Sequence, residues 1–164
     1  MDSLGAQAVT AQASEEENGQ EFLASFDALA QAIRRARGAV AQDRPGQLTF
    51  SQYALLTPLA TNHAARVSDL AAEASIAPST ATRILDALER RAIVRRDRSD
   101  EDRRQVRITL TELGRRTLCA QDEWMRGRQR AFFEELPDVE RELVADLLLR
   151  LSKLIDELAA GPEG

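Results

Sequence analysis

The sequence has 164 residues, of which 43% are hydrophobic and 30% are charged. This composition excludes an intrinsically disordered chain, and no hydrophobic run reaches the ~18 residues that a membrane span needs. Aromatic residues make up only 4%, so a core of Leu, Ala, Val and Ile is expected, a mixture that favours helices. The net charge of −5 argues at first sight against binding to nucleic acid. The arginines, however, are concentrated between Arg83 and Arg107, and the local field decides what a surface attracts.

The single cysteine, Cys119, excludes an internal disulfide and fits a reducing compartment. The first residues lack the basic segment followed by an apolar segment that is typical of a signal peptide. We therefore expect a cytoplasmic protein without a membrane partner.

The N-terminal part is expected to contain a tail followed by one helix. Residues 1–19 have almost no large apolar side chain, which predicts a disordered tail. From Glu21 to about Ala41, apolar residues recur at steps of three and four and predict an amphipathic helix. The turn-forming segment 43–46 is expected to end it.

The next predicted helix begins at a capping box, Thr49-Phe50-Ser51-Gln52, in which the first and last side chains can each bond to the other's backbone amide. Pro58 removes a backbone hydrogen bond, so it is expected to kink or shorten this helix. Residues 61–65 are predicted to form a connection.

Residues 68–90 have the pattern of two short helices joined by a tight turn. Ser68 is expected to cap a helix over residues 69–74, and residues 75–77 to form the turn. Pro78 suits the first position of the second helix. The apolar positions of that helix are Ala81, Ile84, Leu85 and Leu88, and the polar positions opposite are Ser79, Thr82, Arg83, Asp86 and Arg90. This pattern predicts a helix-turn-helix.

A β-hairpin is predicted to follow. Ile93-Val94 begins one strand, and residues 106–110 alternate apolar and polar side chains as a second strand does. The segment 96–104 is too charged to be buried and has a length that suits the hairpin tip. A helix-turn-helix followed by such a hairpin is a winged helix, so the predicted fold class is mainly α with a small β-hairpin wing.

Two long helices are predicted after the hairpin. Thr111 can cap the first, which runs to about Glu135, and Leu136-Pro137-Asp138 ends it. The last helix, residues 139–158, has an apolar stripe that is wide for the end of a small domain. Such a stripe indicates a partner outside its own chain.

The start of the second helix of the helix-turn-helix carries the candidate DNA-reading residues Ser79, Thr80, Thr82 and Arg83. Arginine can donate two hydrogen bonds to guanine, whereas Ser and Thr contact base edges or phosphates less selectively. A solvated helix face would show the same residue types, but the hairpin that follows favours DNA. The main alternative is a winged helix used for protein–protein assembly, for which apolar anchors are expected at these positions.

No motif in the sequence indicates an active site. There is one histidine, His63, with no glycine-rich phosphate loop and no Cys/His cluster at metal-ligand spacing. We therefore predict a protein that is not an enzyme and that needs neither a metal nor a cofactor.

Four segments, taken together, resemble the MarR family of regulators: LTFSQY at 48–53, VSDLA at 67–71, PSTATR at 78–83 and DRRQVRITLT at 102–111. The last of these, followed by Gly114, is similar to the family's D-x-R…L-T-x-x-G signature and is the most specific. The resemblance covers about residues 21–158. The sequence departs from the pattern at Ser75 and Ala92, where glycine is common, and at Ala77, where a Ser or Thr cap is common.

The resemblance implies a homodimer whose N- and C-terminal helices hold two winged helices apart. One MarR-like domain is then expected over residues 20–160, with an N-terminal dimerisation helix (20–48), a DNA-binding module (49–111) and C-terminal dimerisation helices (112–160). The interface residues would be Phe22, Phe26, Leu147, Leu151, Leu154, Ile155 and Leu158. Such dimers bind pseudo-palindromic operators in double-stranded DNA, usually as repressors, and many are released by a small ligand or by thiol oxidation.

The resemblance also implies roles for the wing. Arg104 would enter a minor groove while Asp102 holds its guanidinium, and Arg98 and Arg103 would attract phosphates. Ser68 is placed at the DNA as well. The alternative for the wing is a charge-rich, solvated loop, because its acids nearly balance its arginines: Asp97, Asp100, Glu101 and Asp102. Simple solvation is also the alternative for Arg95, Arg96 and Arg107.

A pocket for a small aromatic or phenolic effector would lie between the dimer helices and the winged helix. Its candidate lining residues are Phe26, Tyr53, His63 and Trp124, with core packing as the alternative role of the aromatic side chains. Thiol-based redox sensing through Cys119 is the alternative to release by a ligand, because Arg115 and Arg116 lie close in sequence. A buried, inert thiol is the other interpretation of that residue.

Overall fold

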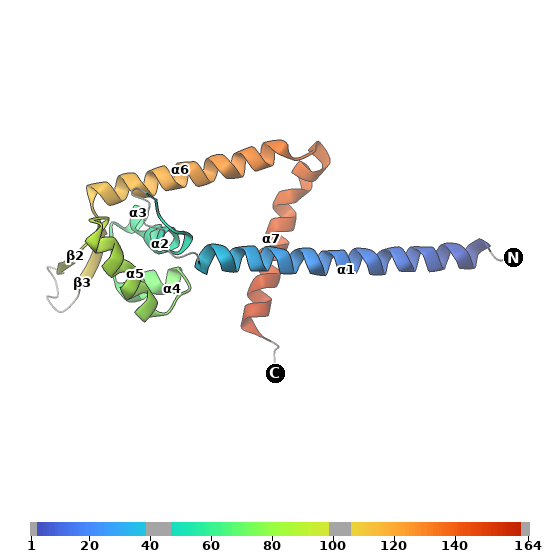
Figure 1. Ribbon diagram of the computed structural model, residues 1–164, viewed down its shortest axis with the longest axis horizontal. Coiled ribbons are helices and arrows are strands. Elements are labelled where there is room, and N and C mark those ends of the chain that lie inside the picture. The colour runs from blue at the N-terminus through green and yellow to red at the C-terminus, as the bar shows by residue number, and fades with distance from the viewer. Residues whose placement is uncertain (1–2, 39–46, 99–105, 162–164) are drawn as a thin grey trace. The chain divides into compact units, whose positions relative to one another are not determined.

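The structure is a computed structural model that describes residues 3–38, 47–98 and 106–161 (Figure 1). The chain divides into two compact units, Met1–Cys119 and Ala120–Gly164. The first contains α1 (Ser3–Gly38), α2 (Phe50–Leu56), α3 (Pro58–Asn62), β1 (Ala64–Ala65), α4 (Val67–Glu73), α5 (Pro78–Arg90), β2 (Val94–Arg98) and β3 (Val106–Leu110). Helix α6 (Glu112–Glu135) begins in the first unit and continues into the second, which also contains α7 (Asp138–Ala160). A mainly helical chain with a small antiparallel sheet confirms the predicted fold class.

The structure corrects the prediction of a disordered tail over residues 1–19. Helix α1 already begins at Ser3 and runs without a break to Gly38. The segment has almost no large apolar side chain, but it is rich in Ala, Gln and Glu, which are among the best helix formers. Local helix propensity therefore continues the helix N-terminally beyond its apolar stripe.

Helices α2 and α3 follow the predicted pattern. The Thr49 hydroxyl accepts from the Gln52 amide at 3.2 Å, and the Gln52 side chain accepts from the Thr49 amide at 3.0 Å, which completes the capping box. Helix α2 ends at Leu56 and α3 begins at Pro58, so the proline divides the helix as expected.

The wing sheet has three strands in the order β1-β3-β2, all antiparallel. The predicted connection 61–65 is wrong in part, because α3 continues to Asn62 and Ala64 and Ala65 pair with Thr109 and Ile108. A two-residue strand of alanines has no alternation from which to recognise it. Strand β2 extends to Arg98, so residues 96–98 belong to the strand and not to the tip.

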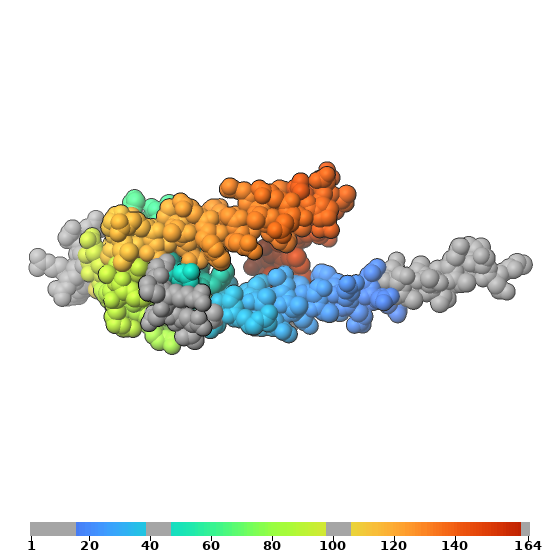
Figure 2. Space-filling view, turned by 45° about the horizontal axis from the view of Figure 1, so that its top comes forward, coloured from blue at the N-terminus to red at the C-terminus, as the bar shows by residue number. Residues whose placement is uncertain are grey.

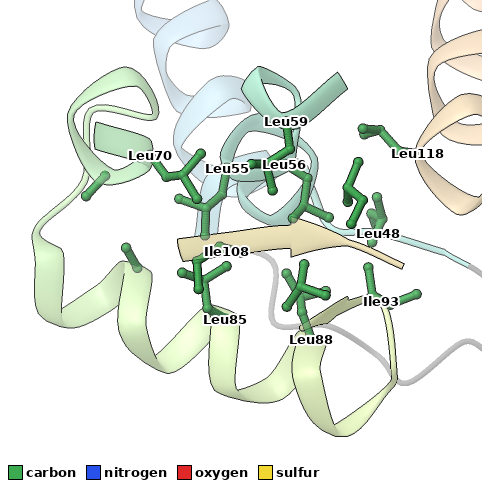
Figure 3. Close-up of a cluster of buried hydrophobic side chains, with 14 residues drawn as sticks. Leu48, Leu55, Leu56, Leu59, Leu70, Leu85, Leu88, Ile93, Ile108 and Leu118 are labelled. Carbon is green, nitrogen blue, oxygen red and sulfur yellow. The ribbon is translucent and has the colours of Figure 1, made fainter. Parts of the chain in front are cut away.

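The core of the first unit is built around strand β3. Ile108 is fully buried, with Leu85 and Leu88 of α5 on one side of the strand and leucines of α2, α3 and α4 on the other in the view of Figure 3. The largest fully buried side chains are Leu55, Leu56, Leu59, Leu70, Leu85, Leu88, Ile108 and Val94. Residues of α5 and of the wing strands thus belong to one core, so the helix packs against the base of the sheet.

The second unit consists of the C-terminal part of α6 and of α7. Its bend falls at Leu136 and Pro137, where the predicted break lies. The Arg141 guanidinium donates to the carbonyl oxygens of Leu136 (2.7 Å), Glu134 (3.1 Å) and Phe133 (3.2 Å), which caps the C-terminal end of α6. No side chain of α7 is buried. Within the described part of the chain, no helix is both long enough and apolar enough to cross a membrane.

Candidate nucleic-acid interface

The N-terminal half of α5 presents the predicted DNA-reading residues. Ala77 is extended, and Pro78 begins the helix as predicted. Ser79, Thr82 and Arg83 are exposed, and Thr80 is half-buried; helix α5 also lies at the surface of the first unit in Figure 2. The Thr82 hydroxyl donates to the Pro78 carbonyl at 2.9 Å, so toward a ligand this oxygen can only accept.

Helix α4 starts differently from the prediction. It begins at Val67 with Arg66 as its N-cap residue, so Ser68 lies inside the first turn and does not cap the helix. The Ser68 hydroxyl instead donates to the Asp69 carboxylate at 3.0 Å and remains exposed. Helix α4 packs on α5, with Leu70 and Ala71 buried and Val67 partly buried against the same core.

The positions where the sequence lacks the common glycines adopt the backbone conformation that glycine favours. Ser75, in the turn before α5, has φ 52°, and Ala92, just after α5, has φ 54°. For a residue with a Cβ this left-handed conformation costs about 1–2 kcal/mol. The turn geometry of the helix-turn-helix is therefore kept at a local cost in stability.

Arg96 joins the wing to α5. Its guanidinium bonds to the Asp86 carboxylate at 2.5 Å and to the Glu89 carboxylate at 2.7 Å. The hydrogen bond to Asp86 is the largest cause of a pKa for Arg96 that lies even above its ordinary value. Simple solvation therefore does not describe Arg96, whose side chain is 29% exposed.

A second polar cluster lies across strands β2 and β3. Arg95 stands opposite Thr109 in the sheet register. The Asp97 carboxylate accepts from the Thr109 hydroxyl and from the Arg95 guanidinium, each at 2.8 Å. The bond from Thr109 first, and then that from Arg95, lowers the pKa of Asp97 below its ordinary value of 3.8. This cluster occupies Arg95 within the sheet.

The outer part of the wing carries the remaining predicted contacts. The backbone of Arg98 pairs with Val106 at the end of the hairpin strands. Asp102, Arg103 and Arg104 lie outside the described residues. Arg107 is half-buried, and its buried Nε has no hydrogen-bond partner among the described residues.

The Thr111-x-x-Gly114 segment connects the wing to α6. The Thr111 hydroxyl accepts from the Gly114 amide at 2.9 Å and donates to the Ala92 carbonyl at 2.6 Å, so Thr111 caps α6 as predicted. A Cβ at Gly114 would lie 2.0 Å from the Ile93 carbonyl oxygen. Only glycine lets α6 approach the end of α5 and the start of β2 this closely.

The predicted effector residues have different surroundings. Phe26 is half-buried and its ring lies 6.2 Å from that of Phe22, whereas Tyr53 packs against the core. His63 is exposed at the end of α3. Trp124 belongs to the second unit and is 63% exposed, so it does not have the core role considered for the aromatic side chains.

The predicted interface residues retain much accessible surface in the single chain. Phe22, Leu147, Ile155 and Leu158 are exposed, and Phe26, Leu151 and Leu154 are half-buried. Cys119 is exposed on α6, which corrects the interpretation of a buried thiol. In the described ranges, no group of three or more His, Cys, Asp and Glu side chains is placed to hold a metal ion.

Sequence reasoning missed the roles of Arg96 and of Arg91. Arg91, at the end of α5, donates to the Gln47 carbonyl at 2.9 Å and to the Gln52 side chain at 3.4 Å, and so ties α5 to the start of α2. The spacing of Asp86 and Glu89, three residues apart on one helix, is a signal for a shared cationic partner. The identity of that partner depends on the tertiary structure.

Comparisons with known proteins agree with this architecture. The sequence profile of the MarR family matches residues 48–106. The uncharacterized HTH-type transcriptional regulator YxaD of Bacillus subtilis is 32% identical over 112 residues, which are 68% of this chain and 78% of that protein. The structure of the transcriptional repressor CouR bound to a 23-mer DNA duplex is 29% identical, with a TM-score of 0.62 over 82% of this chain and 90% of that one. Bordetella bronchiseptica BpsR, whose DNA binding is regulated by 6-hydroxynicotinic acid, has a similar structure. Its sequence is 25% identical, and the TM-score is 0.58 over 78% of this chain and 98% of that one.

Proposed function

Because the chain belongs to the MarR family of DNA-binding transcriptional regulators, we propose that it is a homodimeric repressor that a small aromatic effector releases from its operator. The operator would be a pseudo-palindrome in cytoplasmic double-stranded DNA, since a two-fold symmetric dimer presents two identical DNA-binding modules to two half-sites. The observation that carries the proposal is the exposed hydroxyl and guanidinium surface at the start of α5, next to the wing.

Helix α5 would read the major groove. Arg83 is exposed and can donate two hydrogen bonds to one guanine, which makes it the best candidate for base recognition. Thr82 can only accept, so it suits the exocyclic amino group of adenine or cytosine. Ser79 and Thr80 would donate to phosphates and set the register of the helix. Ser68 would do so only after its hydroxyl turns from the Asp69 carboxylate toward the DNA.

The wing would read the neighbouring minor groove. A narrow minor groove concentrates negative potential, and Arg104, held by Asp102, would enter it. Arg98 and Arg103 would contact the flanking phosphates. The structure of the repressor CouR, a similar protein, is bound to a 23-mer DNA duplex, which supports duplex DNA as the partner.

The dimer would form through α1 and the C-terminal helices. Phe22 and Phe26 contribute one apolar patch. The C-terminal contribution comes from Leu147, Leu151, Leu154, Ile155 and Leu158 of α7, which has no buried side chain in the single chain. Covering such a surface is the ordinary reason for an obligate dimer.

The effector would be a small aromatic or phenolic acid, for which Phe26, Tyr53 and His63 of the first unit and, separately, Trp124 of the second are the candidate contacts. BpsR, whose DNA binding is regulated by 6-hydroxynicotinic acid, supports this ligand class. The two alternatives have less support. An assembly module without DNA contact does not fit relatives that are transcriptional regulators, and the exposed Cys119 has no second cysteine in the chain with which to form an intramolecular disulfide.

The decisive experiment is footprinting on the DNA that flanks the gene, followed by binding titrations at several salt concentrations with and without aromatic acids. We expect protection of two half-sites and a steep loss of affinity with salt, because each neutralised phosphate releases counterions. Arg104→Ala should weaken binding about tenfold and reduce the salt slope by about one. Dimerisation and thermal stability should remain those of the wild type.

Arg128→Ala is the matched control, because Arg128 is an exposed arginine of α6 with the same charge. It should leave affinity and slope unchanged. Unchanged affinity of the Arg104→Ala variant at physiological salt would remove Arg104 from the mechanism. The absence of any protected DNA would contradict the proposed function as a whole.

A further inference from the structure

We propose that Arg96 is a positioning residue for DNA binding, which clamps the wing to α5 so that helix and wing enter two neighbouring grooves at once. The proposal rests on the proposed function and deepens it. It assigns to Arg96 no contact with DNA.

The geometry of the clamp is specific. Asp86 and Glu89 lie three residues apart and so on the same face of α5. Arg96 spans both carboxylates, with its Nη2 on Asp86 at 2.5 Å and its Nη1 on Glu89 at 2.7 Å. One planar guanidinium thereby joins two turns of the helix to the middle of strand β2, a geometry that a single ammonium group cannot reproduce.

The position of Arg96 in the strand explains why the clamp controls the wing. Arg96 stands opposite Ile108, the buried centre of β3, and two residues before β2 ends at Arg98. Among the described residues, Arg96 is therefore the residue nearest the wing tip for which an ion pair to α5 is seen. Arg95, the residue directly before Arg96 on the same strand, donates to Asp97 and Thr109 within the sheet and not to α5.

The clamp also removes an electrostatic obstacle. Asp86 and Glu89 are acidic residues on the helix that would lie in the major groove, and unpaired carboxylates would repel the phosphates. Because Arg96 bonds to both, its positive charge offsets one of their two negative charges and leaves neither carboxylate unpaired. Both of its terminal nitrogens, Nη1 and Nη2, donate to these carboxylates, which argues against a phosphate as its main partner.

The first arm of the test separates positioning from direct contact by removing the carboxylates. In Asp86→Ala/Glu89→Ala, Arg96 is freed and two negative charges are lost. A direct phosphate contact by Arg96 predicts tighter operator binding by this variant, whereas a clamp predicts binding several-fold weaker than wild type. This arm decides the proposal whatever Arg104 does.

The second arm tests whether Arg96 acts through the wing. Arg96→Ala should weaken operator binding about tenfold, the effect of one lost charged contact. In the Arg104→Ala background the same substitution should cost clearly less than tenfold, because the wing contact is already lost and only the exposure of the two carboxylates remains. Arg96→Lys, which can reach one carboxylate at a time, should fall between wild type and Arg96→Ala.

Arg95→Ala is the control for charge alone, since it removes one positive charge from the same strand and leaves the clamp intact. It should change affinity less than about twofold, the modest effect expected of an exposed charge. Thermal unfolding identifies a merely structural effect: because the clamp side chains are 29%, 42% and 38% exposed, the midpoints of the clamp variants should stay close to wild type.

Two results would overturn the proposal while the proposed function stands. One is wild-type or tighter affinity of Asp86→Ala/Glu89→Ala, and the other is an undiminished effect of Arg96→Ala in the Arg104→Ala background. A wild-type protein that protects no DNA would overturn the proposed function itself and, with it, the clamp.

Discussion

Gly114→Ala tests the close approach of α6 to the end of α5. The added Cβ would lie 2.0 Å from the Ile93 carbonyl oxygen, 3.0 Å from the Ile93 carbonyl carbon and 3.3 Å from a methyl group of Leu110. An ordinary van der Waals contact with the oxygen needs about 1 Å more. The two Ile93 atoms belong to the backbone, so no flexible side chain can move aside to make room. The backbone must therefore move.

The movement would disturb several hydrogen bonds. The Ile93 carbonyl accepts from the Thr111 amide at 3.0 Å, and the Thr111 hydroxyl caps α6 through the Gly114 amide at 2.9 Å. Overpacking costs about 1–3 kcal/mol, and the weakened hydrogen bond and cap cost about 1 kcal/mol each. Alanine returns about 1 kcal/mol of helix propensity. The net expectation is a loss of about 3 kcal/mol in the free energy of unfolding.

Thermal and urea unfolding at fixed protein concentration would measure this loss, because the stability of a dimer depends on concentration. For a chain of this size, about 3 kcal/mol corresponds to a midpoint lower by roughly 6–12 °C. Gly127→Ala is the matched control: Gly127 also lies within α6, and its Cβ would meet nothing within 4 Å. It should be as stable as wild type or more stable by up to about 1 kcal/mol. Equal stability of the two variants would refute the steric argument.

Two further changes test local conformation and charge. Ala92→Gly should raise the free energy of unfolding by about 0.5 kcal/mol, because glycine relieves the strain of the positive φ of 54°, and its greater chain entropy in the unfolded state cancels part of that gain. A lower urea midpoint would contradict this. The control is Ala87→Gly in the helical interior of α5, which should lower the free energy of unfolding by about 1 kcal/mol. Asp97→Asn should be less stable than wild type at neutral pH. Since the folded-state pKa of Asp97 is lowered below 3.8, the contribution of its carboxylate is fully present above that value and is lost as pH falls through the folded-state pKa. Urea unfolding between pH 7 and pH 3 should therefore show the two proteins converging at the acid end, and a constant gap would refute the assignment.

The elements that could be predicted from the sequence are those with local signals. The capping box at Thr49, the division at Pro58, the start of α5 at Pro78 and the Thr111 cap are each encoded within a few residues. Ser75 and Ala92 stand where the family commonly has glycine, and both have a positive φ, because the turn imposes that conformation on whichever residue stands there.

The features that could not be predicted depend on contacts between distant segments or on weak propensities. Strand β1 exists because β3 offers an open edge to Ala64 and Ala65, which carry no strand signal of their own. Ser68 resembles a cap in isolation, yet the packing of α4 moves the helix start to Val67. The clamp of Arg96 joins residues ten positions apart through a tertiary contact, and among several neighbouring arginines no local pattern distinguishes the one that forms it.

The structure also explains how a chain with a net charge of −5 suits a DNA partner. At physiological salt a charge acts over about 8 Å, so the field at the reading surface depends on nearby groups and not on the sum. The first half of α5, from Pro78 to Leu85, contains Arg83 and no acidic residue, and a helix N-terminus adds positive potential. The acids that follow, Asp86 and Glu89, are paired with Arg96. If this pairing is what makes the surface compatible with phosphates, loss of Arg96 should harm binding by exposing two carboxylates as well as by releasing the wing.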